Sequence, residues 1–506
     1  MTRPEPAVRA DDRPDEWHRL SPWMIAVRPI EQLPQLFPLI LAIVFAGRGA
    51  PDVGVVLTIV AVPLVTVVPW LMTRYQVTDE HVRLRTGLIT RKVATARRDR
   101  IRSVDLTASP PHRILRLTKI RIGTGTDKGA STVELNAIGS TDAQALYARL
   151  MDTARAPSDQ TPADEPSPPE VLSRLDMSWL RFAPFSLTGF ATAAAAAGLA
   201  AQAANEAGLF ERGATAAERV VDTVRDIPVA VLVVGIVVAV LVVGVALSVA
   251  GYLLAYWNFS LTRRRDDHTL HVRRGLLTTN VTSLDENRIR GIHFHEPILM
   301  RPVGGARLQA IATGSDKTPL LLPPAPAAEA VRVGELVAHD GDELTGHLRR
   351  HGAGALARRV TRSIWGGAVI AAAVVVGVVV GPLPWPWVVV GALVLLGSVA
   401  PGLIRYRHLG VRVSERSVVI APPRLARHRY AIDRDGVVGW TTRASWFQRR
   451  RGVETTVLAT AAGTEAYAAV DLEPTASTMV MTTVSPDLLA PFVVRSDETG
   501  SIDQVS

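Results

Sequence analysis

Long apolar blocks without a charged side chain constrain this chain more than any other feature. There are six of them in three pairs, of which residues 227–257 are the longest. The pairs are 33–47 with 53–72, 182–204 with 227–257, and 364–381 with 385–404. A helix needs about 20 apolar residues to cross a bilayer. Buried core helices are the alternative, and the length of 227–257 argues against it. We therefore predict six membrane spans in three helical hairpins.

The distribution of arginine predicts how these spans are oriented. Residues 74–122, after the first hairpin, carry thirteen Arg or Lys against four acids. Residues 205–226, within the second hairpin, carry five acids against three arginines. Segments rich in Lys and Arg stay on the cytoplasmic side. We expect a multi-pass protein of the bacterial plasma membrane with both termini and all large polar regions in the cytoplasm.

A passage that occurs twice divides the chain into repeats. "RLRTGLITRKVATARRDRIRSV" (83–104) returns as "HVRRGLLTTNVTSLDENRIRGI" (271–292), each time after an apolar hairpin. Self-similarity of this kind indicates a repeated structural unit. The shared motif that we take as structural is Gly87, Leu88 and Ile101 in the first copy and Gly275, Leu276 and Ile289 in the second.

The polar units between the hairpins have the pattern of β-structure closed by a helix. "YQVTDEHVRLRTG" alternates apolar and polar residues, and "LTKIRIGTGTDKGASTVELNAI" predicts two strands around a turn. Helices are expected at 140–154 and 326–340. The predicted fold class is an α+β membrane protein. Each of its three hairpins is followed by a small cytoplasmic β-barrel with a C-terminal helix.

The third unit departs from this pattern. "GVRVSERSVVIAPPRLARHRYAIDRDGVVGW" has "APPRL" where the other copies have the glycine–leucine turn. We align Arg434 with Arg100 and Arg288, and we expect a short last helix near 485–493. Any site shared by the first two units is expected to be weakened or lost here.

The chain resembles the bacterial pleckstrin-homology-like (PH-like) domains, also called membrane-flanked domains. The resemblance rests on the hairpins, the "GLLT" strands, "ENRIRGI" and the Gly-rich turn. The resemblance implies a PH-like β-barrel capped by a C-terminal helix, and no established enzymatic activity. It also implies a link to resistance against membrane-active peptides, often beside a smaller membrane protein with one PH-like domain.

The expected organisation follows from the hairpins and the repeat. In chain order it is a cytoplasmic segment (1–32), hairpin 1 (33–73), PH-like domain 1 (74–154), a proline-rich linker (155–178), hairpin 2 (179–257), PH-like domain 2 (258–340), a linker (341–363), hairpin 3 (364–404), a divergent PH-like domain 3 (405–494) and a disordered tail (495–506).

Charge and composition point to an anionic partner. The formal net charge is +9, and the chain has no cysteine, which excludes thiolate metal sites and cysteine nucleophiles. Aromatic residues make up only 5% and do not alternate with basic ones, which disfavours nucleic acid. Membrane lipid is the expected partner.

Basic residues of the repeated strands and turns are the candidate contacts for a partner or for lipid. They are Arg98, Arg100, Arg102 and Lys128 in the first unit and Arg288, Arg290 and Lys317 in the second. Solvated charge that only reinforces topology is the competing interpretation. His293 and His295 share one strand face, but two ligands without a third make no metal site. We predict no metal, no cofactor and no catalytic residue.

These features bear on three classes of function. The first is a non-enzymatic adaptor or envelope-stress factor that binds proteins or the inner leaflet. The second is a transporter or channel component, for which charged residues inside the spans are expected, and none is present. The third is a lipid-modifying enzyme, for which no recurring acid–base pair is found. The adaptor is the prediction, with the transporter as its alternative.

Overall fold

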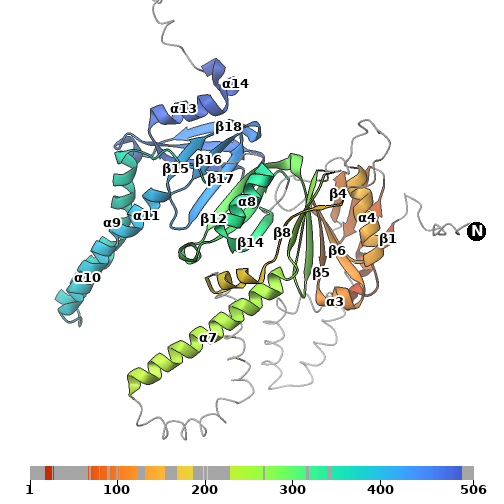
Figure 1. Ribbon diagram of the computed structural model, residues 1–506, viewed down its shortest axis with the longest axis horizontal. Helices are drawn as coiled ribbons and strands as arrows, with labels where there is room; N and C mark the ends of the chain where they lie inside the picture. The colour runs from red at the N-terminus through yellow and green to blue at the C-terminus, as the bar shows by residue number, and fades with distance from the viewer. Residues whose placement is uncertain are drawn as a thin grey trace, which may run out of the picture. The chain divides into compact units, whose positions relative to one another are not determined.

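The computed structural model describes residues 17–25, 27, 67, 70–78, 80–87, 92–97, 101, 103–123, 132–153, 168–185, 198, 202, 228–265, 268–314, 318–338 and 344–492. The predicted span 33–47, most of 53–72 and of 182–204, residues 1–16, linker residues 155–167 and the tail 495–506 lie outside them. The described chain is a mixed α+β protein (Figure 1). We divide it into module 1 (17–153), module 2 (168–338) and module 3 (344–492).

Module 1 has two sets of antiparallel strands and a closing helix. Its first sheet is β1 (His18–Arg19), β2 (Arg74–Val77), β3 (His81–Thr86) and β4 (Lys92–Arg97). The second set is β5 (Ser103–Ala108), β6 (Leu117–Gly123) and β7 (Thr132–Gly139), with α3 (Pro110–Ile114) after β5 and α4 (Ser140–Thr153) at the end. The strands predicted around residues 117–138 and the helix predicted at 140–154 are thus confirmed.

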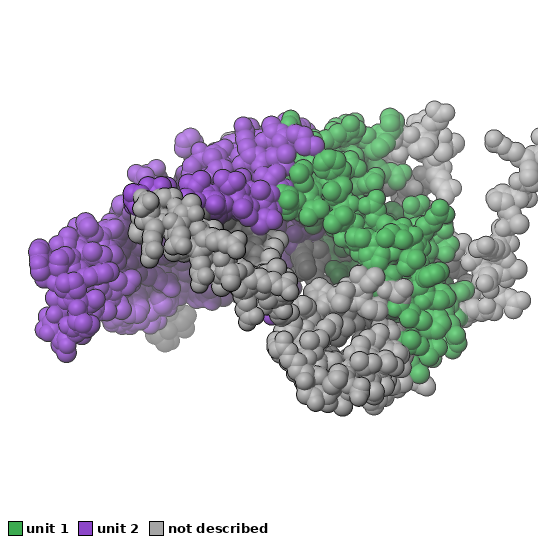
Figure 2. Space-filling view, turned by 90° about the horizontal axis from the view of Figure 1, so that it is seen from below, with its two compact units in different colours: residues 1–176, 250–288, 313–317 green, residues 177–249, 289–312, 318–506 purple. Residues whose placement is uncertain are grey.

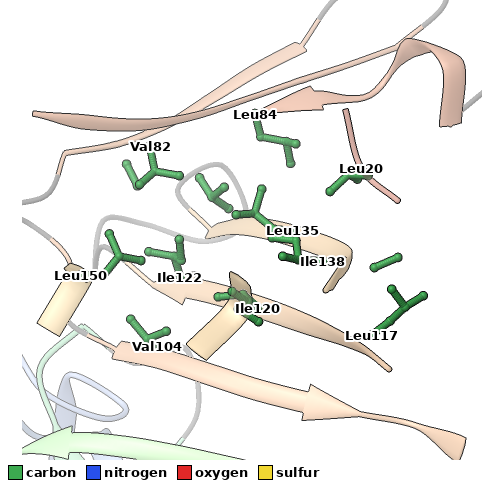
Figure 3. Close-up of a cluster of buried hydrophobic side chains, with 14 of the residues drawn as sticks. Leu20, Val82, Leu84, Val104, Leu117, Ile120, Ile122, Leu135, Ile138 and Leu150 are labelled. Carbon is green, nitrogen blue, oxygen red and sulfur yellow. The ribbon is translucent and has the colours of Figure 1, made fainter. Parts of the chain in front are cut away.

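The core of module 1 lies between these two strand sets (Figure 3). Val82 and Leu84 of β3 meet Ile120 and Ile122 of β6, and all four side chains are buried. They occupy alternate positions because successive side chains of a strand point to opposite faces. Burying each such side chain contributes about 1.5–3 kcal/mol.

Module 2 repeats the same order of elements. A short strand and a 3-10 helix come first, then the long helix α7 (Val229–Tyr256), six strands and α8. The elements are β8 (Glu170–Arg174), η2 (Met177–Phe185), β9 (Ser260–Arg264), β10 (Thr269–Arg274), β11 (Thr279–Asp285), β12 (Ile289–Glu296), β13 (Gly305–Ala312), β14 (Leu320–Pro326) and α8 (Ala327–Ala338). β8 lies within 155–178, the segment that the sequence marked as a linker.

Module 3 has the same order again. The elements are α9 (Ala353–Val379), α10 (Pro386–Gly397), α11 (Val399–His408), β15 (Gly410–Val413), β16 (Ser417–Ala421), β17 (Arg427–Asp433), β18 (Val437–Arg443), α12 (Trp446–Arg449), β19 (Glu454–Thr460), β20 (Ala466–Leu472), α13 (Pro474–Val484) and α14 (Pro486–Leu489). The short helix expected near 485–493 is α14. The helix that packs on this module's core is α13, through Ala476, Val480 and Val484, and the sequence reading missed it.

Neighbouring modules share sheets. One sheet has the order β7-β6-β5-β11-β10-β9-β8, and another has the order β14-β13-β12-β17-β16-β15. The junctions are the antiparallel pairs β5–β11 and β12–β17. Every sheet has an open strand order among the described strands, so none of them is a closed barrel. The closed barrels that the sequence predicts are not found among these sheets, and the edges of β5, β11, β12 and β17 pair between modules instead.

The shared sheets also explain how the chain divides into compact units. Unit 1 comprises residues 1–176, 250–288 and 313–317, and unit 2 comprises the rest (Figure 2). Unit 1 holds module 1 together with β9–β11, whereas unit 2 holds β12–β14 together with module 3. The division therefore runs through module 2 and follows the sheets.

Three described helices are long and apolar enough to cross a membrane. They are Val238–Tyr256, Ala353–Val379 and Pro386–His408, the last made of α10 and α11. α9 and α10 pack against each other as a hairpin (Figure 1). Small residues allow the close approach, since a Cβ on Gly367 would lie 2.6 Å from the Ser398 Oγ.

A strand or bridge that precedes each apolar segment pairs with the strand that follows it. His18 and Arg19 of β1 pair with β2, β8 pairs with β9, and Arg349 bridges to Val411 of β15. Each apolar segment is therefore inserted into the edge of a module's first sheet, and its two ends lie next to each other.

Candidate functional site

The repeated glycine and isoleucine have structural roles. Gly87 and Gly275 have φ values of +110° and +107°, and a Cβ on Gly275 would lie 2.0 Å from the Thr278 carbonyl oxygen. Only glycine adopts such a turn without strain. Ile101 and Ile289 are 2% and 8% exposed. The backbone carbonyl oxygen of Leu276 accepts a hydrogen bond from the Arg113 guanidinium at 2.8 Å.

Of the predicted contact residues, the structure describes Arg288 and Arg290. Arg98, Arg100, Arg102, Lys128 and Lys317 lie outside the described residues, as does Leu88 of the repeated motif. The Arg288 guanidinium donates to the Ile101 carbonyl oxygen at 2.8 Å and lies 3.1 Å from the Asp285 carboxylate. Arg290 is half-buried, and its Cβ would be 3.1 Å from a Cβ on Gly436. Arg288 thus connects modules 1 and 2.

The alignment of Arg434 with Arg288 is wrong. A 3-10 turn comes directly before the first strand of the second set in both modules, as Glu286–Arg288 before β12 and as Arg434–Gly436 before β18. Gly436 therefore stands where Arg288 stands, and Arg434 corresponds to Glu286. Arg434 donates instead to the Glu415 carbonyl oxygen at 3.1 Å.

The two histidines of β12 belong to a stacked cluster at the β12–β17 junction. His293 lies opposite Tyr430 and His295 opposite His428, with ring centroids 4.3 Å and 4.1 Å apart. An amide oxygen accepts, so His293 Nδ1 donates to Gln309 Oε1 at 3.0 Å. In the neutral His293 ring Nε2 then accepts from His428 Nδ1 at 3.0 Å.

Burial is the main cause that keeps this cluster neutral. It lowers the pKa of His293 and of His295 to about 4 and that of His428 to about 3, helped by the nearby charges of Arg307 and Arg424. The described residues include no group of three or more His, Cys, Asp or Glu side chains arranged to hold a metal ion. The cluster is a packed contact between strands.

A cavity lined by arginines lies at the polar end of the α9–α11 hairpin. It has a volume of about 390 Å³ and is lined by Arg359, Arg362, Arg405, Pro423, Arg424 and Leu425. We call it the arginine cavity. Arg362 and Arg405 bracket residues 364–404, which contain no charged side chain. No carboxylate lines the cavity among the residues that the structure describes.

The helix α9, which supplies two of the four arginines of this cavity, is fixed to module 3 by a buried ion-pair network. Arg358 and Arg359 of α9 both pair with Asp471 of β20, whose side chain is fully buried. Gln448 also donates to Asp471, at 2.9 Å. Asp471 offsets one of these two positive charges, and Arg362, Arg405 and Arg424, which are not part of this network, add the rest of the positive charge of the cavity.

A second opening lies near the same end of the α9–α11 hairpin. This cleft of about 650 Å³ is lined by residues just before α9 and just after α11, together with one face of α13. Arg349, Arg350, Arg412 and Arg434 contribute to it, and so do Glu415 and Glu473. Its mixed charge makes it a weaker candidate for an anion than the arginine cavity.

Sequence reasoning missed the arginine cavity because it treated these arginines only as topology signals. The available signal was the position of Arg362 and Arg405 immediately outside an apolar block. Arg424 could not be connected to them, since it comes from the turn between β16 and β17 and meets them only in the folded module.

Comparison with known proteins fits this architecture. The family of bacterial PH domains matches the chain three times, at residues 31–154, 219–338 and 367–479. The matches end at or within α4, α8 and α13. No curated protein and no solved structure matches the chain. Since the matches cover more than half of the chain, and each includes the six strands of one module, the chain belongs to the bacterial PH domain family.

Proposed function

We propose that this protein is a non-enzymatic, multi-pass protein of the bacterial plasma membrane that binds anionic lipid headgroups through its arginine cavity and serves as an adaptor. The observation that carries the proposal is the position of Arg362, Arg405 and Arg424. They line a cavity that has no carboxylate among its described lining residues, at the point where an apolar hairpin joins a PH domain. Basic pockets between helices at the cytoplasmic surface suit anionic headgroups.

The proposed topology has six spans, with both termini in the cytoplasm. Each apolar segment leaves a sheet edge and returns to the same edge, through β1–β2, β8–β9 and Arg349–Val411. Two ends that pair in one sheet lie on one side of a membrane, so each segment crosses an even number of times. The hairpin α9–α11 fits two crossings. α7 supplies one crossing of the second segment, which then needs at least one more.

PH domains are generally non-catalytic, and this supports the non-enzymatic part of the proposal. Recruitment of a smaller membrane protein with one PH-like domain, and resistance to membrane-active peptides, are further parts of the proposal. Nothing specific favours the transporter alternative, because residues 229–256 and 364–404 contain no charged side chain.

Retention of phosphatidylglycerol by the full-length protein tests the proposal. Arg362→Gln/Arg405→Gln should lower its affinity for this lipid by roughly 30-fold, since each arginine contributes about 1 kcal/mol. Native mass spectrometry of detergent-purified protein, titrated with phosphatidylglycerol or phosphatidylcholine, measures the effect. Arg407→Gln is the matched control, because Arg407 lies on the same helix and does not line the cavity.

Two outcomes would overturn lipid binding at this site. One is equal retention of both lipids by the wild type. The other is an equal loss of affinity in the Arg407 control and in the double variant. Inorganic phosphate added at the same concentration separates the sources of the anion, because a free-phosphate site would be saturated by it and would release the lipid.

A further inference from the structure

The two junctions between modules are the same interface used twice. At each one, the first strand of the second set of one module pairs antiparallel with the third strand of the next module. Leu284 lies opposite Ser103 at the first junction, and Ile432 lies opposite Gly291 at the second. These residues correspond, because Leu284 pairs with Leu270 within module 2 as Ile432 pairs with Val418 within module 3. The register is identical at both junctions.

A repeated interface of this kind leaves one unused half at each end of the chain. We call the strand in the place of β5 and β12 the outgoing strand, and the strand in the place of β11 and β17 the incoming strand. In module 3 the outgoing strand is β18, the edge of the sheet β18-β19-β20. In module 1 the incoming strand is β4, the edge of β1-β2-β3-β4. Among the described strands neither edge has a second partner. Each chain therefore carries one outgoing and one incoming edge that match each other.

The exposure of these strands agrees with an unused interface. In β12, which β17 covers, only Arg290 and His295 are not fully buried. In β18, at the same place in module 3, Val438 is 66% exposed and Thr441–Arg443 are exposed. Gly291 is in close contact with the Ala431 carbonyl oxygen, whereas a Cβ on its counterpart Gly439 would meet nothing within 4 Å. In β4, Val93 is 51% exposed.

We propose that β18 of one copy of this protein pairs antiparallel with β4 of a second copy, as a continuation of the module junction. The register of the two internal junctions fixes the pairing. Gly439 lies opposite Ala96, Trp440 opposite Thr95, Thr441 opposite Ala94, and Thr442 opposite Val93. Threonine, valine and tryptophan suit the paired strands of a sheet. The interface is head-to-tail, so assembly continues to a ring or an open chain.

A second copy is the occupant that the chain itself argues for. An edge strand with unpaired backbone groups accepts another strand, unless a proline or a covering segment blocks it. β18 and β4 contain no proline. The bulge near the start of β18 is also present in β12, where it does not prevent pairing with β17. Both halves of the interface occur once in every copy.

The pairing ends with Arg443 opposite Lys92, two like charges that weaken it. Arg443→Glu places opposite charges there and should lower the dissociation constant roughly five-fold. Arg443→Glu/Lys92→Glu restores like charges and should return the dissociation constant toward that of the wild type. Mass photometry of the full-length protein in lipid nanodiscs, over a dilution series, measures this.

Cysteine crosslinking tests the register, since the chain contains no cysteine of its own. Two differently tagged full-length copies, Thr442→Cys and Val93→Cys, are reconstituted together and oxidised. Residues directly opposite each other have Cβ atoms about 5 Å apart, so we expect a disulfide between the two tags. Arg97→Cys with Thr442→Cys is the control, because Arg97 lies four residues further along the strand. Unfolding temperatures show whether each variant is folded.

Three results would overturn the proposal. They are monomers at every concentration, equal crosslinking of the control pair, and crosslinking of Thr442→Cys to itself or to a protein of another mass. Arg362→Gln/Arg405→Gln should assemble like the wild type, because the lipid cavity is a separate surface. Loss of lipid binding and loss of assembly are therefore distinguishable.

Discussion

At the scale of single residues, the histidine cluster shows how a buried contact depends on protonation. His293, His295 and His428 are held neutral, with pKa values of about 4, 4 and 3 in the folded protein against about 6.5 for an exposed imidazole. Between these values the unfolded chain binds protons that the folded chain does not. Folding is therefore favoured above pH 6.5, and its free energy becomes less favourable as the pH falls towards 4.

We expect the full-length protein in detergent to lose stability between pH 7 and pH 5, by about 1–2 kcal/mol for each of these imidazoles. Thermal unfolding across this pH range measures the slope. His293→Gln/His295→Gln/His428→Gln should flatten it, whereas His347→Gln, at an exposed histidine, should not. An unchanged slope in the triple variant would contradict the assignment.

The residues that could be predicted from the sequence are those with a local cause. Gly87 and Gly275 were recognisable as turn glycines, and Ile101 and Ile289 lie in a strand pattern. Whether Arg288 faces solvent or a neighbouring backbone depends on residue 101, far away in the chain. No local pattern carries that information, and the same holds for Arg424 in the arginine cavity.

At the scale of elements, two equivalent glycines of β12 and β18 differ in whether a side chain could be accommodated. Gly291 has a φ of +153°, and a Cβ there would lie 2.1 Å from the Ala431 carbonyl oxygen. The backbone of β17 can approach β12 only because residue 291 has no side chain. Gly439 has the same place in β18 without such a neighbour.

Gly291→Ala should therefore destabilise the junction by about 2 kcal/mol or more, through backbone strain and the clash with β17. Gly439→Ala should cost less than about 1 kcal/mol. Thermal unfolding compares the two variants, and hydrogen exchange of the β17 amides shows whether the loss is local. Equal effects of the two substitutions would argue against the close approach.

Strands and helices whose apolar residues recur at a regular spacing could be predicted from the sequence. Pairings between strands that are distant in the chain could not. The alternation around residues 117–138 and the helical spacing at 140–154 and 326–340 each correspond to an element. β1 has only two residues and β8 follows a proline-rich stretch, so neither shows a period. The pairs β5–β11 and β12–β17 join strands more than 130 residues apart, which no window along the sequence can detect.

At the scale of the whole molecule, shared sheets make the modules interdependent. β5 of module 1 completes a sheet with β9–β11 of module 2, and β12 does the same with β15–β17 of module 3. Chain segments that leave and re-enter these sheets contain the apolar helices. The proposed membrane topology therefore follows from strand pairing together with the hydropathy of the helices.

Single cysteines in the full-length chain test this topology. Arg19→Cys, Arg265→Cys and Arg350→Cys lie at exposed positions beside the pairing strands. An impermeant maleimide should label all three only after the cells are permeabilised. Pro382→Cys, in the turn between α9 and α10, should be labelled from outside in intact cells. Labelling of any of the first three from outside would contradict the proposed orientation.

The short strand ahead of each apolar segment has a consequence for biogenesis. β8 emerges from the ribosome before α7, but its partner β9 emerges only after it. In the proposed topology, the two strands can meet only after the intervening segment has been inserted and has returned to the cytoplasmic face. Completion of each sheet would then require that the preceding hairpin had been inserted correctly. A copy with a failed insertion would keep an unpaired strand accessible to cytoplasmic proteases.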